Sequence, residues 1–185
     1  MARTRKIKTD DILDAAERVV MRDGAAGLSI DAVAQEAGVS KSRVVYDHKS
    51  KSALLEALID RHMTAEESRI REAVSSHGKA PHPELFGRIS LAEEAPDDID
   101  RAVCLAISAA MSSEEKLHER MRAWTKADLE AMKAGPRPRA ALLAYLALTG
   151  LCCMELFDFH RWETGERHDI LDGIKDIYAS LPDKK

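Results

Sequence analysis

The sequence contains few cysteines and few of the features that mark a secreted or membrane-spanning chain. Only 3 of its 185 residues are cysteines, and two of them, Cys152 and Cys153, are adjacent, a spacing that rarely forms a disulfide. A membrane helix needs about 18 uninterrupted apolar residues, but the longest apolar region, 140–159, contains Glu155 and Asp158. The N-terminus lacks the apolar segment of a signal peptide. We therefore expect a cytoplasmic protein.

Aromatic residues and β-strand patterns are also scarce. Aromatic side chains make up 4% of the chain, and long alternating runs of β-branched residues are missing. Alanine, leucine, glutamate, lysine and arginine are abundant, and these residues favour helices. The composition therefore predicts an all-α fold. The length is sufficient for a hydrophobic core that needs neither disulfides nor metal ions.

Apolar residues at helical spacing, interrupted by polar caps and by glycine or proline, divide the chain into about nine helices. N-caps are expected at Thr9, Ser29, Ser40 and Ser50. Ser112 precedes Glu115 by three residues, which is the spacing of a capping box. The main breaks are expected at Gly24, at Gly38, at 78–83 and at 135–138. The predicted helices cover about 10–23, 30–37, 41–47, 51–76, 84–89, 98–111, 113–133, 139–160 and 168–181.

Positive charge is concentrated near the N-terminus. The whole chain has a net charge of −4. Residues 1–51 contain 10 Lys or Arg against 8 Asp or Glu. Most of these cations lie in two clusters, at 3–8 and at 41–51. Taken alone, the small excess favours an ordinary solvent-exposed basic face over an anion-binding surface, but the clustering makes the context of each cluster important.

The second cluster lies in a helix-turn-helix pattern. The predicted helices 30–37 and 41–47 are separated by a turn at Gly38, where the absence of a Cβ permits a sharp change of direction. Val44 is expected to face inward, and the polar residues of the second helix outward. A helix of this kind fits the major groove of DNA, where the base edges can be distinguished.

This region resembles the TetR family of bacterial transcription regulators. The resemblance covers about residues 9–59 and rests on 12–16 (ILDAA), 37–41 (AGVSK) and 49–55 (KSKSALL), in that order. It implies a DNA-binding domain at 1–51, containing an N-terminal arm and a three-helix helix-turn-helix unit. It also implies a helical domain for ligand binding and dimerisation at 52–185.

The resemblance assigns roles to individual residues. Ser29 caps a helix and contacts phosphate, while Lys41, Ser42 and Arg43 read base edges. Tyr46 packs on the DNA backbone, and Lys51 neutralises a phosphate. The arm at 3–8 adds backbone or minor-groove contacts. The predicted DNA-binding residues are Ser29, Ser40, Lys41, Ser42, Arg43, Val45, Tyr46, Lys49 and Lys51.

Three positions depart from the family pattern, which usually has Tyr at 45, His at 47 and Phe at 48. Val45 loses a hydroxyl donor but can still contact a thymine methyl group. Asp47 is expected to weaken DNA binding by placing a negative charge near phosphate. His48 is either a hydrogen-bonded core histidine or a residue that leaves the recognition helix freer to move.

The resemblance also implies a homodimer, formed through about 139–181, that binds a palindromic operator. The family implies a repressor that is released by a small apolar or amphipathic ligand. Candidate lining residues, equally consistent with plain core, are Met63, Ile107, Met111, Met121 and Trp124.

Two alternatives remain at this point. One is a degenerate family member that senses a ligand or partner and binds DNA weakly. The other is a helical enzyme or carrier, although the sequence contains no catalytic or phosphate-binding motif, and we expect neither enzymatic activity nor a cofactor. Cys152, Cys153 and His160 suggest a metal or redox sensor, but small thiols more often fill gaps in packed interfaces. We therefore predict no metal site.

Overall fold

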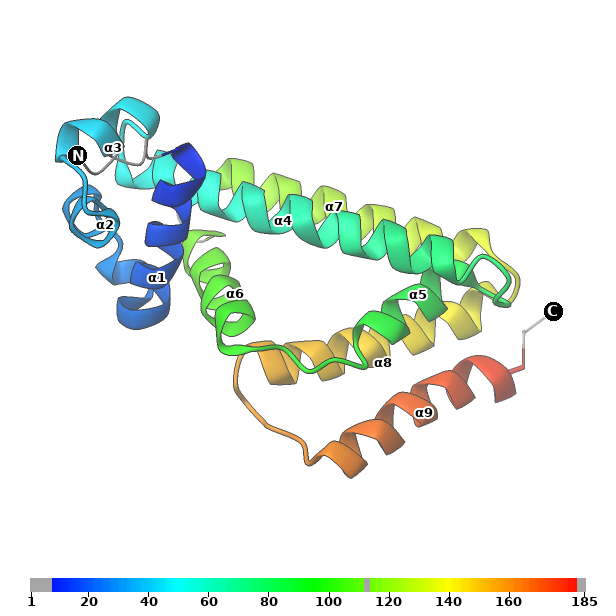
Figure 1. Cartoon of the computed structure of the whole chain (residues 1–185). Helices are drawn as coiled ribbons and strands as arrows, with labels where there is room; N and C mark the ends of the chain where they lie inside the picture. Colours follow the sequence, from blue (N-terminus) through cyan, green and yellow to red (C-terminus); the bar gives the residue numbers. More distant parts are fainter. Residues whose placement is uncertain (1–7, 112–113, 183–185) are drawn as a thin grey trace. The chain divides into compact units, whose positions relative to one another are not determined.

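The computed structural model describes residues 8–111 and 114–182, and within them it contains nine α-helices and no strand. The helices, labelled in Figure 1, are α1 (Thr9–Gly27), α2 (Ile30–Ala37), α3 (Lys41–Asp47), α4 (Lys51–Ser76), α5 (Pro83–Leu91), α6 (Asp98–Met111), α7 (Glu115–Ala134), α8 (Pro138–Leu156) and α9 (Thr164–Ser180). The predicted all-α class is confirmed. Most of the predicted N-terminal arm and the predicted cap Ser112 lie outside the described residues.

The chain forms two compact units. Unit 1 contains Met1–Thr64 and Asp98–Ser113, and unit 2 contains Ala65–Asp97 and Glu114–Lys185. Helix α4 contributes its first half to unit 1 and its second half to unit 2. The functional boundary after Lys51 stays a prediction.

Unit 1 has an apolar core between α1, α2, α3, the first half of α4 and α6. The side chains that form it are buried: Ile12, Leu13, Ala15, Ala16, Val19, Val20, Leu28, Val33, Ala34, Val44, Leu54, Leu58 and Ala106. These residues recur at helical spacing, so each helix turns one apolar face towards the others. The core fixes the position of α3.

Serine caps begin three helices of unit 1, as predicted. Ser29 Oγ accepts the Ala32 N–H at 3.1 Å, and Ser50 Oγ accepts the Ala53 N–H at 3.0 Å. Ser40 caps α3. The turn between α2 and α3 places Gly38 at φ 66°, a left-handed conformation that glycine adopts without strain.

The expected start of α1 was wrong, whereas the expected break at Gly24 is present. Helix α1 begins at Thr9 rather than after it, and the Asp11 carboxylate accepts the Lys8 N–H at 2.7 Å in place of a threonine cap. Gly24 is a break in helical structure, as expected. It lies at a kink with φ 68° and ψ 179°, and helical structure resumes up to Gly27.

The predicted ends of the last two helices were also displaced. Helix α8 stops at Leu156 instead of 160, because Asp158 adopts a φ of 54° that a right-handed helix cannot continue through. Helix α9 starts at Thr164, several residues before the predicted 168. The apolar pattern continues past Leu156 as far as Phe159, so pattern alone did not reveal this break.

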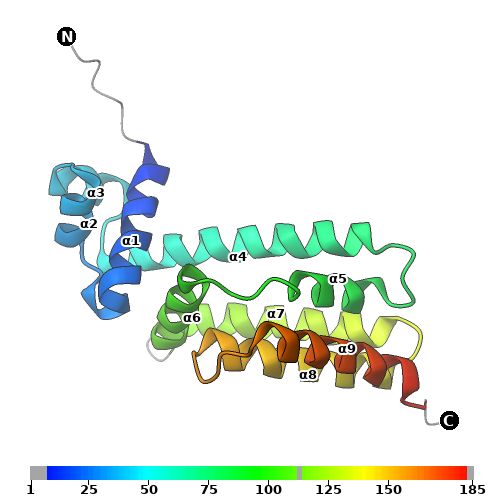
Figure 2. The ribbon, with the colours of Figure 1, turned by 60° about the horizontal axis from the view of Figure 1, so that its bottom comes forward.

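Unit 2 packs α8 between α7 and α9, with α5 against α7 and α8 (Figure 2). Its buried apolar residues are Leu85, Ile89, Met132, Ala140, Ala141, Ala144, Leu148, Leu151, Leu171, Ile174 and Tyr178. Helix α8 alone, among the described residues, has the length and apolar composition to cross a membrane. One third of that segment, 33%, is buried.

Candidate functional site

Helix α3 has polar side chains on its exposed face and one buried apolar side chain on the opposite face. Val44 is fully buried, as the sequence predicts, and Ser40 Oγ accepts the Arg43 N–H at 3.3 Å. Tyr46 is 82% exposed. The other predicted contact residues on and around α3 with exposed side chains are Ser40, Lys41, Ser42, Val45 and Lys49. The structure therefore brings these predicted residues together on and beside one short helix.

Arg43 is held by its neighbours on α3. Its Nη1 donates to Asp47 Oδ1 at 2.8 Å, one helical turn away, and its guanidinium lies 5.8 Å from the Tyr46 ring centroid. The Thr9 hydroxyl of α1 donates to the other Asp47 oxygen at 3.2 Å. The Asp47 side chain is only 8% exposed. Its charge is therefore partly shielded and opposed by arginine, and its expected effect on DNA affinity stays a prediction.

Three of the predicted DNA-binding residues, Lys41, Lys51 and Ser29, have hydrogen-bond or ion-pair partners within the protein itself. The Lys41 ammonium pairs with Asp31 at 2.9 Å, and both side chains are largely exposed. Lys51 Nζ donates to the Ala26 carbonyl oxygen at 3.1 Å. The Ser29 hydroxyl oxygen serves as a helix cap. An exposed ion pair such as Lys41–Asp31 is weak, so a DNA phosphate can replace the aspartate as the partner of Lys41.

His48 ends α3 and is buried. Its Nε2 has no hydrogen-bond partner among the described residues, so this nitrogen gives no support to the interpretation of a hydrogen-bonded core histidine. Burial lowers the pKa of His48, and the neighbouring Asp47 carboxylate opposes that shift. The imidazole is therefore neutral at neutral pH.

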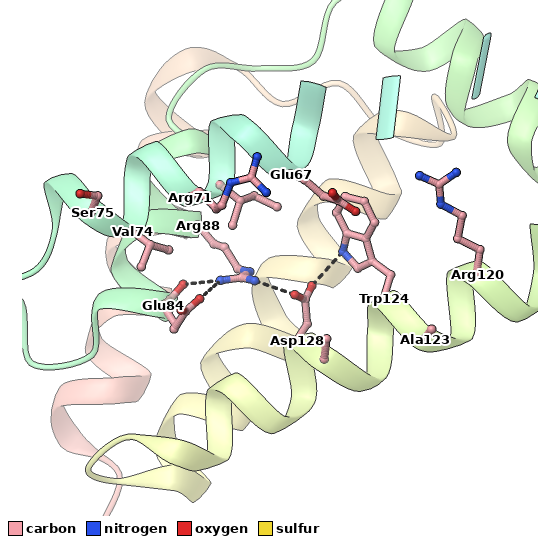
Figure 3. Close-up of a pocket in the computed structure, with 12 residues that line it drawn as sticks. Glu67, Arg71, Val74, Ser75, Glu84, Arg88, Arg120, Ala123, Trp124 and Asp128 are labelled. Carbon is pink, nitrogen blue, oxygen red and sulfur yellow. Dashed lines mark hydrogen bonds and ion pairs between the residues drawn. The ribbon is translucent and has the colours of Figure 1, made fainter. Parts of the chain in front are cut away.

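Unit 2 contains a cavity of about 680 Å³ between the second half of α4, α5 and α7. Figure 3 shows its lining, which combines apolar side chains with several charged ones. The lining residues are Glu67, Ile70, Arg71, Val74, Ser75, Glu84, Arg88, Arg120, Ala123, Trp124, Ala127 and Asp128. This volume lies in the range of small-molecule sites.

Asp128 is the centre of a polar network on the cavity wall. It accepts Arg88 Nη2 at 2.6 Å, Trp124 Nε1 at 3.2 Å and the Tyr145 hydroxyl at 2.9 Å. Arg88 Nη1 also donates to Glu84 at 2.6 Å (Figure 3). Burial, reinforced by the Asp128 charge, raises the pKa of Tyr145 to about 12. The network joins α5, α7 and α8.

Of the predicted ligand-binding residues, only Trp124 lines this cavity. Met121 lies one turn earlier on α7, and Met63, Ile107 and Met111 belong to unit 1. Sequence reasoning missed the charged lining. Residues four positions apart share a helix face. The pairs Glu84–Arg88 and Trp124–Asp128 have this spacing, so the sequence did indicate that their polar side chains lie side by side.

Helix α8 leaves apolar side chains uncovered. Leu146 is 50% exposed, and Leu143 and Met154 are exposed as well. Cys152 lies on the same helix, and burial raises the pKa of its thiol to about 11. Within 8–111 and 114–182, no group of three or more histidine, cysteine or carboxylate side chains gathers around one point.

Two family profiles match the chain. One, described as "Bacterial regulatory proteins, tetR family", covers residues 12–58, and the other, "Tetracyclin repressor-like, C-terminal domain", covers 86–179. No curated protein matches the sequence closely enough to count as a relative.

Solved structures share the fold. The multidrug binding protein EbrR in complex with imidazole is 21% identical, with a TM-score of 0.64 over 97% of this chain and 98% of that one. EbrR in complex with ethidium is 24% identical, with a TM-score of 0.61 over 89% and 96%. A TetR-like transcriptional regulator from Rhodococcus sp. RHA1 is 18% identical, with a TM-score of 0.61 over 96% and 100%.

Proposed function

The chain belongs to the TetR family of bacterial regulatory proteins, and we propose that this transcriptional regulator is a cytoplasmic repressor released from a palindromic operator by a small molecule. The observation that carries the proposal is the surface of α3. Its polar side chains, Lys41, Ser42 and Arg43, lie at the start of a short helix anchored by buried Val44. The N-terminal residues of such a helix are those that reach base edges in the major groove.

The remaining cations bind the DNA backbone and fix the register of the complex. Lys49 and Lys51 lie at the junction of α3 and α4, and both are exposed. A lysine at the start of a helix strengthens an anion site that the helix N–H groups already provide. Backbone contacts add affinity but carry no sequence information.

The uncovered face of α8 is the homodimer interface, together with α9. Leu143, Leu146, Gly150 and Cys153 are exposed and recur at alternating spacings of three and four residues, the pattern of a helix-packing seam. An added Cβ at Gly150 or at Gly173 of α9 would meet no atom within 4 Å, so a second subunit can approach closely there. Two-fold symmetry then presents two α3 helices to one DNA molecule, which requires a palindromic site.

The cavity of unit 2 binds the effector, an apolar or amphipathic compound. Ile70, Val74 and Trp124 provide an apolar wall, and the charged side chains provide polar contacts. EbrR, a protein of similar fold, is described in complex with ethidium and proflavin. Helix α4 lines the cavity with residues 67–75 and packs into the core of unit 1 through Leu54 and Leu58. A ligand that prefers one arrangement of α4 therefore changes the affinity for DNA.

DNA binding tests this proposal first. We expect the purified protein to bind a fragment from upstream of its own gene and to lose affinity steeply between about 50 and 200 mM salt. Arg43→Ala should reduce specific binding by about 1–3 kcal/mol and relax the choice of one base, whereas Lys51→Ala should weaken binding to all sequences alike. If both variants bind like the wild type, the site assignment is wrong.

A degenerate family member with weak DNA binding is the second candidate function. The observation that favours it is the end of α3, where Arg43 is tied to Asp47 and His48 is buried without a partner for Nε2. In that case, the protein would bind ligands or a partner but would show no preference for any duplex at low salt. Neither candidate function is enzymatic.

A further inference from the structure

We propose that Asp47 is a positioning residue for sequence readout, which holds the Arg43 guanidinium in the orientation that meets a guanine. The inference rests on the proposed function, because it takes Arg43 as the base-reading side chain. Position 47 departs from the family pattern, so the resemblance itself does not imply this role. A negative charge at a DNA-facing helix would otherwise be unfavourable.

The geometry carries the proposal. Arg43 Nη1 and Asp47 Oδ1 are 2.8 Å apart on the same face of α3, and Tyr46 contributes a ring 5.8 Å from the guanidinium. The second oxygen of Asp47 accepts the Thr9 hydroxyl at 3.2 Å, which ties the carboxylate to the start of α1. Asp47 is therefore fixed at both oxygens, and it fixes one nitrogen of Arg43 in turn.

Fixing Arg43 matters because a free arginine side chain loses rotamer freedom when it binds a base. A side chain that is already ordered avoids much of that entropic penalty. The guanidinium carries five N–H donors, and a bidentate contact to guanine uses two of them, so the bond to Asp47 and a base contact are compatible in number. The side chain of Arg43 is 32% exposed, so part of it faces solvent, where a base edge can meet it.

A purely electrostatic role for Asp47 predicts the opposite result. Removing a carboxylate near phosphate strengthens binding to every duplex and leaves the choice of bases unchanged. Under the positioning role, removing it can still strengthen nonspecific binding, but it reduces discrimination at the base that Arg43 reads. The ratio of specific to nonspecific affinity separates the two roles.

The test measures binding of the full-length protein to an operator selected from a random duplex library and to every single-base change of one half-site. Asp47→Ala should lower discrimination at one guanine by roughly fivefold or more, the lower part of the range for an arginine–guanine pair. Thr9→Val removes the hydroxyl donor without changing charge, and it should lower discrimination at the same base with an unchanged salt dependence. Glu56→Gln, which removes an exposed carboxylate from α4, is the matched control and should leave discrimination intact.

A double-mutant comparison shows whether Asp47 acts through Arg43. In the Arg43→Ala background, Asp47→Ala should have no further effect on discrimination, whereas a merely structural residue would still reduce it across all positions. The proposal is overturned if Asp47→Ala and Thr9→Val keep the wild-type base preference, or if preference falls equally at every base. If the wild type selects no duplex, the proposed function fails and this inference with it. Wild-type selectivity combined with unaffected variants overturns the positioning role alone.

Discussion

The two compact units fill their interiors in different ways. The core cluster of unit 1 consists of apolar side chains from α1, α2, α3, α4 and α6. Unit 2 adds buried ion pairs to its apolar core: Arg167 and Glu155 lie 2.7 Å apart with side chains 9% and 5% exposed, and Arg88 pairs with Asp128 on the cavity wall. The first interior holds α3 in place, and the second includes the Arg88–Asp128 pair that lines the cavity.

The contrast shows what each interior provides. The hydrophobic effect is non-directional, so apolar packing holds α3 in place through many contacts that are individually weak. A buried ion pair contributes little net stability, but it is unfavourable to break because the remaining charge has no partner. Unit 2 should therefore tolerate loss of a charged partner poorly, and unit 1 should be most sensitive to backbone and packing changes.

Breaking the buried pair of unit 2 should give the largest effect. Arg167→Ala leaves the Glu155 carboxylate buried and removes donors from the carbonyl oxygens of Glu93 and Glu94. The free energy of unfolding should fall by about 3–5 kcal/mol, as measured by urea denaturation. The double variant Glu155→Leu with Arg167→Met should recover much of this loss. If the free energy of unfolding of Arg167→Ala lies within about 0.5 kcal/mol of the wild-type value, the contrast between the two interiors is contradicted.

A backbone change in unit 1 should have the next largest effect. Gly38 has φ 66°, and an added Cβ would meet no atom within 4 Å. Gly38→Ala should therefore destabilise the protein by about 1–2 kcal/mol through the left-handed conformation alone. Gly38→Asn, which tolerates that conformation better, should lose less in the same denaturation experiment. Equal losses for the two variants would point to a packing effect instead.

His48 should make the stability of unit 1 depend on pH. Burial lowers its folded-state pKa below the ordinary value of 6.5, so the unfolded chain binds the proton more readily. The stability present above about pH 6.5 is then lost as the pH falls towards the lowered pKa. His48→Leu should reduce the loss of stability between about pH 7.5 and about pH 5.5. Parallel curves for the two proteins would show that His48 does not contribute.

The smallest change is one of reactivity rather than stability. Because burial raises the pKa of Cys152 to about 11, its thiol stays protonated near neutral pH. Iodoacetamide should modify Cys152 far more slowly in the native protein than in urea, as followed by mass spectrometry of the digested chain. Similar rates in both conditions would show that this side of α8 opens readily.

The sequence predicted unit 1 better than unit 2, for a physical reason. Ser29, Ser40 and Gly38 act locally, within three or four residues of the backbone groups they satisfy, so their roles can be read from short motifs. The cavity forms only where α4, α5 and α7 come together in space. Asp128 accepts hydrogen bonds from Arg88 and Tyr145, which are distant from it in the sequence. Such long-range contacts leave no local pattern.

Even within unit 1, one long-range contact escaped prediction. Thr9 has the residue type of a helix cap, but its hydroxyl donates to Asp47, 38 positions later. The adjacency of Arg43 and Asp47 at four residues was visible in the sequence, but the burial of the carboxylate was not. The effects of Asp47 and His48 on DNA binding, where the sequence departs from the family pattern, stay predictions.

Hydroxyl-radical footprinting of the purified protein on a selected duplex tests the central claim most directly. Two copies of α3 should protect two symmetric half-sites with centres about 34–36 Å apart along one face of the DNA. Leu146→Glu, which places a charge on the proposed seam of α8, should abolish the paired footprint at concentrations where the wild type binds. A single protected half-site, or uniform protection without sequence preference, would contradict the account.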